Sequence, residues 1–99
     1  MYRRILRRMR EEIRRRRYVM TLHADEEMND DGLTIYDVER GILTGEILER
    51  QKDQATGEWK YRLRGETSER GGVEVVARMG PTARLVIITI YLVGETEGR

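Results

Sequence analysis

The chain has 99 residues, of which 37% are charged and 38% hydrophobic, and it contains no cysteine. This length predicts one domain with a modest core, and the lack of cysteine excludes disulfides and thiolate metal sites. No stretch reaches the roughly 18 apolar residues of a membrane helix, and the N-terminus has no apolar signal-peptide core. We therefore expect a soluble, cytoplasmic protein with no membrane partner.

The net charge of +1 conceals an asymmetry along the chain. Residues 1–17 contain nine Arg and two Glu, which gives nine minus two, or +7, so residues 18–99 carry −6. Clustered Arg is typical of a surface that binds nucleic acid or a partner, but a solvated helix face has the same composition, and both interpretations stay open. We interpret residues 1–17 as an amphipathic helix that extends a single domain at 18–99. Its apolar residues recur at helical spacing: Tyr2, Ile5, Leu6, Met9 and Ile13.

A short strand and two short helices are predicted next. The strand is expected at residues 18–22, and Gly32 can end the first helix in a left-handed cap. Thr34 begins the second helix, with Asp37 as its partner in a variant of the capping box. Gly45 is expected to end that helix.

The remainder of the sequence predicts strands joined by short turns. Such strands pair as an antiparallel meander, and because the helices precede them the fold class is α+β. We expect N-terminal helices packed on one face of a four- to five-stranded, mainly antiparallel sheet. The strands are predicted at residues 46–52, 58–64, 73–79 and 85–93.

The most apolar stretch is Leu85–Val93, in which only Thr89 is not apolar. Its β-branched residues favour a strand that is buried on both faces. Strict alternation predicts that Thr89 and Tyr91 point away from the helices. The helix-facing side is then predicted to consist of Val86, Ile88, Ile90 and Leu92.

The same alternation predicts a candidate phosphate-binding surface. If Trp59, Tyr61 and Leu63 pack under the helices, several cations emerge on the open face beside Thr89 and Tyr91. Guanidinium groups match phosphate geometry, and metal-free RNA cleavage needs only such cations with an acid and a base. The solvated face of an antiparallel sheet has the same pattern, so this alternative stays open. The cations are Lys60, Arg62, Arg64 and Arg78.

His23, the single histidine, is expected where the first short helix begins. Glu27 lies four residues further along and would share its helix face, so it could orient the ring or hold it protonated. A general acid or base, an imidazolium that binds phosphate, and a residue with only local hydrogen bonds are all compatible with this position. A metal site formed with Glu27 and Asp31 is disfavoured, because metal motifs usually contain more than one His or Cys. We expect no metal and no cofactor.

The order of these pieces resembles a bacterial family catalogued as domain of unknown function 4258. The resemblance covers about residues 18 to 93 and leaves out the Arg-rich helix. That family looks like small bacterial toxins of the RelE, BrnT and MqsR kind, which are mRNA endonucleases neutralised by an antitoxin. The motifs that carry the resemblance include T-L-H-A at 21–24, D-G-L-T at 31–34, G-E-I-L-E at 45–49, K-Y-R-L-R-G at 60–65 and V-I-I-T-I-Y at 86–91.

The resemblance implies a toxin-like RNA-binding protein that is a candidate metal-independent endoribonuclease, with RNA and a cognate antitoxin as partners. It implies acid–base roles for His23 and Tyr91. Many members of the family have Arg where this chain has Glu27 and Asp31, and carboxylates there would repel phosphate. The alternative hypotheses are a non-enzymatic module that binds protein or nucleic acid through the Arg-rich helix, and a homodimer. The implied phosphate-binding residues are Lys60, Arg62, Arg64 and Arg78.

Overall fold

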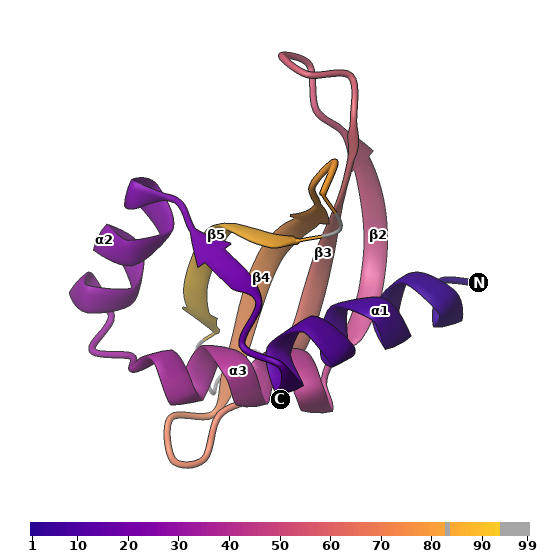
Figure 1. The fold of residues 1–99 in the computed structure, drawn as a ribbon. Helices are drawn as coiled ribbons and strands as arrows, with labels where there is room; N and C mark the ends of the chain where they lie inside the picture. Colours follow the sequence, from indigo (N-terminus) through magenta and orange to yellow (C-terminus); the bar gives the residue numbers. More distant parts are fainter. Residues whose placement is uncertain (83, 94–99) are drawn as a thin grey trace.

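The computed structural model describes residues 1–82 and 84–93 of the chain. Within them, three helices accompany one five-stranded sheet (Figure 1). This arrangement confirms the predicted α+β class. In chain order the elements are α1 (Arg3–Arg14), β1 (Tyr18–Met20), α2 (Leu22–Asp30), α3 (Ile35–Thr44), β2 (Glu46–Lys52), β3 (Trp59–Glu66), β4 (Gly72–Met79) and β5 (Leu85–Val93).

The sheet has the strand order β1-β5-β4-β3-β2. Strands β2 to β5 form the predicted antiparallel meander. Strand β1 lies at the far edge and runs parallel to β5, with Tyr18 opposite Leu85 and Met20 opposite Ile87. A parallel pair needs a long connection, and two helices and three strands separate β1 from β5 along the chain. The sheet is therefore mixed, with one parallel pair at its edge.

Helices α1 and α3 cover one face of the sheet and leave much of the other face open (Figure 1). The hydroxyl of Thr34 accepts the backbone N–H of Asp37, whose carboxylate accepts the N–H of Thr34, so the predicted capping box begins α3. Helix α3 lies close to β3 because Gly65 has no side chain: a Cβ there would lie 1.9 Å from the carbonyl oxygen of Gly41. The core beneath the helices contains Met9, Ile13, Val38, Ile42, Leu63, Val73, Val75, Ala77, Leu85, Ile87 and Ile90.

A β-bulge interrupts the alternation of β5. Val76 of β4 pairs with Thr89, whereas the next residue, Ala77, pairs with Ile87. Ile88 is therefore an extra residue between the two pairs. An extra residue moves every following side chain to the opposite face of the sheet from the one that strict alternation predicts.

The bulge makes the predicted orientation of β5 wrong for its first half and right for its second. Before the bulge, the odd-numbered residues Leu85 and Ile87 are fully buried. After it, Ile90 is fully buried and Tyr91 is 39% exposed, as predicted. Of the four residues expected in the helix-facing core, Ile90 alone is fully buried, and Val86, Ile88 and Leu92 are half-buried. Leu92 still packs against the core, whereas Val86 and Ile88 do not belong to it.

Helix α2 lies along the edge of β5, where β1 no longer pairs with it. Its N-cap residue, Thr21, donates its hydroxyl to the carbonyl oxygen of the bulged residue (3.0 Å). Further along, the carboxylate of Glu27 accepts the backbone N–H of Ile90 (2.9 Å), and that of Asp31 accepts the N–H of Leu92 (3.0 Å). Exposed strand edges invite pairing with other chains, so these two carboxylates protect an edge that would otherwise be open.

Candidate nucleic-acid interface

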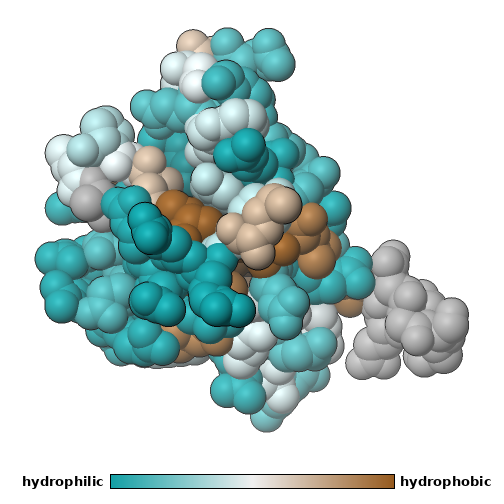
Figure 2. All heavy atoms as spheres, turned by 90° about the vertical axis from the view of Figure 1, so that its right-hand side faces the viewer, coloured by the Kyte–Doolittle hydropathy of each residue, from teal (hydrophilic) through white to brown (hydrophobic). Residues whose placement is uncertain are grey.

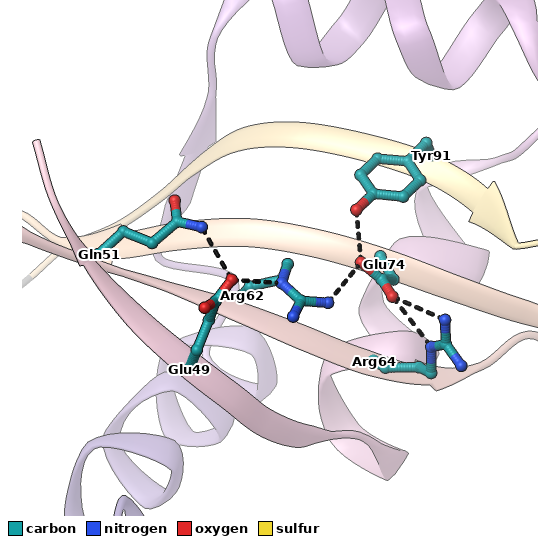
Figure 3. A network of polar contacts seen from close by, with 6 residues as sticks. All are labelled: Glu49, Gln51, Arg62, Arg64, Glu74 and Tyr91. Atoms are coloured by element: carbon teal, nitrogen blue, oxygen red, sulfur yellow. Dashed lines mark hydrogen bonds and ion pairs between the residues drawn. The ribbon is translucent and has the colours of Figure 1, made fainter.

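The open face of the sheet carries a network of charged side chains centred on Glu74 (Figure 3). Glu74 points from β4, its side chain is only 4% exposed, and it accepts hydrogen bonds from both neighbouring strands. Arg62 donates to one carboxylate oxygen at 3.1 Å and Arg64 to the other at 3.0 Å. The phenol of Tyr91 donates to the same carboxylate from β5. The expected cluster of cations around a phenol is thus present, but with a buried carboxylate at its centre.

Two further carboxylates pair with arginines of this face. Arg62 also donates to Glu49 at 2.8 Å, and Arg78 donates to Glu58 at 2.9 Å. The negative charge of these carboxylates offsets the positive charge of the guanidinium groups, so this face attracts phosphate less strongly than its cations alone would. Three of the four predicted phosphate-binding residues, Arg62, Arg64 and Arg78, form ion pairs with carboxylates. The fourth, Lys60, is half-buried on β3.

The ionisation of Glu74 and Tyr91 follows from these contacts. Burial raises the pKa of Glu74, but the hydrogen bonds from Tyr91, Arg62 and Arg64 together lower it by more than burial raises it. The net pKa therefore lies below the ordinary 4.5. The hydrogen bond to Glu74 raises the pKa of Tyr91 above its ordinary 10.0, and desolvation adds to that effect. The hydrogen bonds from Arg62 and Gln51 lower the pKa of Glu49. At neutral pH the phenol therefore keeps its proton, which disfavours Tyr91 as a general base.

His23 occupies the predicted position at the start of α2. Its Nε2 lies 3.2 Å from Glu27, and its side chain is 65% exposed. Glu27 in turn accepts the backbone N–H of Ile90, so His23 belongs to the edge of β5. Tyr91 belongs to the open face and bonds to Glu74. The two predicted acid–base residues thus take part in separate groups of contacts.

Helix α1 and the turn that follows it carry a second set of arginines, and three of them have structural roles. Arg10 donates to the carbonyl oxygen of Gly45 at 2.7 Å, at the end of α3. Arg17 pairs with the buried Glu12 at 2.9 Å, and Arg15 pairs with Glu11 at 2.8 Å. These contacts hold the C-terminal half of the helix and the chain that follows it.

The first two turns of α1 are different. They contain four exposed arginines that make no ion pair with any residue in the described part of the chain, and we call them the α1 basic surface. Tyr2, at the N-cap, provides no side-chain cap, and the first turn has no acidic residue. A helix N-terminus carries partial positive charge, so cations there reduce helix stability. The surface comprises Arg3, Arg4, Arg7 and Arg8.

A hollow of about 280 Å³ lies beside this surface, between α1 and β3. The rings of Tyr2 and Tyr61 meet edge to face in it, with centroids 6.0 Å apart. In Figure 2, which faces the beginning of α1, apolar side chains gather in a depression surrounded by hydrophilic ones. We call this space the tyrosine hollow; the described residues that line it are Met1, Tyr2, Arg4, Ile5, Arg8, Arg50 and Tyr61.

The sequence analysis supposed that Trp59 packs under the helices. In the structure it does not, and it is 41% exposed. The guanidinium carbon of Arg50 lies 4.0 Å from its ring centroid and the ammonium of Lys52 lies 4.5 Å away. Both cations come from the neighbouring strand β2, so contacts between cations and the aromatic face replace burial. Leu63 is buried as predicted, and Tyr61 packs against the core at its margin.

Sequence reasoning missed the two features that distinguish these surfaces. The sequence analysis named the cations of the open face but not Glu74, which lies at the centre of the network. A single carboxylate among the apolar residues at 73–77 was a usable signal, and pairing with β3 places it opposite Arg64. The tyrosine hollow was missed because it joins Tyr2 to Tyr61, which are 59 positions apart in the sequence, and neither periodicity nor spacing relates them.

These features define a small α+β domain with helices over one face of a mixed sheet and arginines on two separate surfaces. Residues 20–92 match the family described as domain of unknown function (DUF4258), which covers well over half of the chain. The protein belongs to this family, as the sequence motifs indicated. None of the curated proteins and none of the solved structures that were compared matches the chain.

Two findings concern what the described residues could bind. They contain no group of three or more His, Asp or Glu side chains that could hold a metal ion, so His23, Glu27 and Asp31 do not converge as ligands. None of the helices in residues 1–82 and 84–93 is long and apolar enough to cross a membrane.

Proposed function

We propose that this protein binds RNA through the α1 basic surface. The observation that carries the proposal is the set of four exposed arginines in the first two turns of α1, which form no ion pair with any residue in 1–82 and 84–93. They lie where the helix dipole makes positive charge unfavourable, and no carboxylate among the described residues offsets them. A polyanion supplies the missing counter-charge, and binding it releases counterions.

The arginine-bearing sheet face supports this role less well. Arg62 and Arg64 there bond to Glu74, and Arg78 bonds to Glu58, so phosphate would compete with carboxylates already in place. Guanidinium groups without such partners can form bidentate bonds to phosphate at once. The proposal therefore follows the hypothesis of a binding module and assigns no chemical step to the protein.

The test is a salt series of RNA affinity, measured by fluorescence anisotropy with a short labelled RNA. We expect a Kd of about 1–100 μM at physiological salt, the range of electrostatic, non-specific binding. The variant Arg4→Ala/Arg8→Ala should weaken binding and lower the slope of log K against log salt by about 1.4, because each lost single-strand contact removes about 0.7.

The matched control is Arg14→Ala/Arg15→Ala, which removes the same charge from the same helix. Both of its side chains lie near Glu11, so this variant should change the slope much less. Equal losses in the two variants would show a diffuse charge effect instead of a binding surface. Absence of RNA binding by the unaltered protein would refute the proposal outright.

A further inference from the structure

We infer that the tyrosine hollow receives an unstacked base of single-stranded RNA while Arg4 and Arg8 hold the adjoining phosphates. This inference rests on the proposed RNA binding and adds to it the form of the substrate. It would make the protein selective for single strands over duplexes, because a duplex keeps its base faces stacked inside.

The composition of the hollow supports this occupant. Its described lining contains the rings of Tyr2 and Tyr61 with Ile5, and the charged side chains in that lining are all arginines. Aromatic floors with cationic rims are how proteins bind single-stranded nucleic acid: bases stack on rings while the backbone follows the positive charge. With a volume of about 280 Å³, the hollow suits one compact planar group better than a row of several side chains from a peptide.

The geometry of α1 supports it as well. Arg4 and Arg8 are one turn apart on the same helix face, about 6 Å along the axis. Both line the hollow, so two cations flank one aromatic floor on a single side. Arg50 of β2 lines the hollow from the sheet, with its guanidinium over Trp59. A strand that crosses the hollow would therefore meet positive charge on entry and on exit.

A second hollow continues the first and points to more than one nucleotide. It has a volume of about 380 Å³ and shares Ile5 and Tyr61 with the tyrosine hollow. Its other described lining residues include Trp59, Met79 and Glu58. Glu58 is the one carboxylate among them, and it is paired with an arginine of β4 at 2.9 Å. The unbalanced charge around the joined hollows is thus positive.

An acidic peptide is the competing occupant of such a surface. A peptide helix needs a groove with apolar contacts at every third or fourth residue over several turns. The two hollows share two residues and end at the turn that contains Pro81, which is short for that purpose. We therefore favour the single strand and make the peptide an outcome of the experiment.

The experiment compares four probes on the full chain: a labelled uridine 12-mer, a blunt RNA duplex of the same length, polyphosphate, and poly-glutamate. Tyr61→Leu should weaken binding of the 12-mer roughly tenfold, the loss of one stacked base, without changing its salt slope or its duplex affinity. Tyr61→Phe keeps the ring and should bind like the unaltered protein. Because Tyr61 also packs against the core, Tyr2→Leu at the chain terminus provides an independent variant with the same expectation.

Each result decides between the alternatives. If Tyr61→Leu and Tyr2→Leu bind the 12-mer normally while Arg4→Ala/Arg8→Ala does not, RNA binding stands and the base site is refuted. Equal loss for the 12-mer and the duplex also refutes it. If poly-glutamate competes with the 12-mer better than polyphosphate does, the occupant is an acidic peptide. Iodouridine cross-linking should attach to Tyr2 or Tyr61, and attachment only at the open sheet face would overturn the assignment.

Discussion

Two surfaces of this protein carry several arginines each, and they differ in what those arginines touch. On the open sheet face, Arg62 and Arg64 converge on Glu74, and Arg78 pairs with Glu58. On the first two turns of α1, the arginines face solvent without a carboxylate in the described part of the chain. The number of cations on a surface therefore says little about phosphate binding until their partners are known.

The surfaces also differ in their relation to the family. The sheet face lies inside the matched residues 20–92, whereas α1 precedes them. The network around Glu74 thus lies within the matched segment, and the α1 basic surface lies outside it. The family match consequently offers no support for α1 as a binding surface, and the proposal depends on the physical argument alone.

The largest expected effect comes from removing the centre of the compensated surface. Glu74→Ala leaves Arg64 and Tyr91 without their shared acceptor, and we expect a loss of about 2–4 kcal/mol in the free energy of unfolding. Thermal unfolding should show a midpoint at least about 8 °C lower. Glu66→Ala, an exposed glutamate on the neighbouring strand, is the control and should have little effect.

The same residue predicts a dependence on pH. Because the folded pKa of Glu74 is below its ordinary 4.5, its contribution to stability is present above that pH and is lost on acidification through the folded pKa. Glu74→Gln should flatten the stability profile below pH 4.5. An unaltered profile would mean that the network does not hold the carboxylate in its charged form.

The next largest loss of stability is expected from Glu27 and Asp31, the two carboxylates that the sequence analysis expected to repel phosphate near His23. In the structure Glu27 and Asp31 bond to the backbone of β5, so Glu27→Ala and Asp31→Ala should each cost about 1–3 kcal/mol in unfolding free energy. Their neighbours Glu26 and Asp30 are exposed and provide matched Ala controls. Glu27→Gln retains an acceptor and should recover most of the loss. If all four Ala variants unfold alike, the two side chains do not protect the strand edge.

The extent to which the sequence predicted this structure depends on the range of the interactions. Local signals worked: Thr34 and Asp37 form the capping box, and Gly32 after α2 has the positive φ of the predicted left-handed cap (69°). The bulge at Ile88 could not be predicted from the sequence, because an extra apolar residue inserted in an apolar run does not change the hydrophobic pattern of that run. A bulge is fixed by pairing with β4 and by the hydroxyl of Thr21, which are tertiary contacts.

The candidate site was predicted in the same partial way. Strand alternation placed Arg62, Arg64 and Tyr91 on one face, and the structure brings them together. The charges of these arginines are offset by Glu74 from a third strand. The register that brings Glu74 beside them depends on how β3 and β4 pair, and no single segment of the sequence determines it. Composition did reveal the excess of positive charge in residues 1–17, since that property needs no tertiary information.

A smaller effect is expected from the residues of the hypothetical cleavage reaction. Tyr91→Phe removes one hydrogen bond to Glu74 and should cost about 0.5–1.5 kcal/mol, with RNA affinity unaltered. The stability from this bond is present below pH 10.0 and is lost as pH rises through the raised pKa, so ultraviolet absorbance should show Tyr91 ionising above 10.0.

RNA incubated with the protein in EDTA tests the alternative directly. If the sheet face is a metal-independent endoribonuclease site, RNA is cut there, and both Tyr91→Phe and His23→Ala slow the cutting. We expect these two variants to leave RNA affinity at the level of the unaltered protein. Cleavage that depends on both residues would show that the functional site includes the open sheet face and the edge of β5, and not the α1 basic surface alone.

The most direct test of the comparison removes two arginines from each surface and measures the salt dependence of RNA affinity. Arg4→Ala/Arg8→Ala changes α1, and Arg64→Ala/Arg78→Ala changes the sheet face while leaving Arg62 on Glu74. With folding checked by circular dichroism, we predict that the α1 variant lowers the slope by about 1.4 and that the sheet variant leaves it unchanged. A reduced slope in the sheet variant, with an unchanged slope in the α1 variant, would contradict the account.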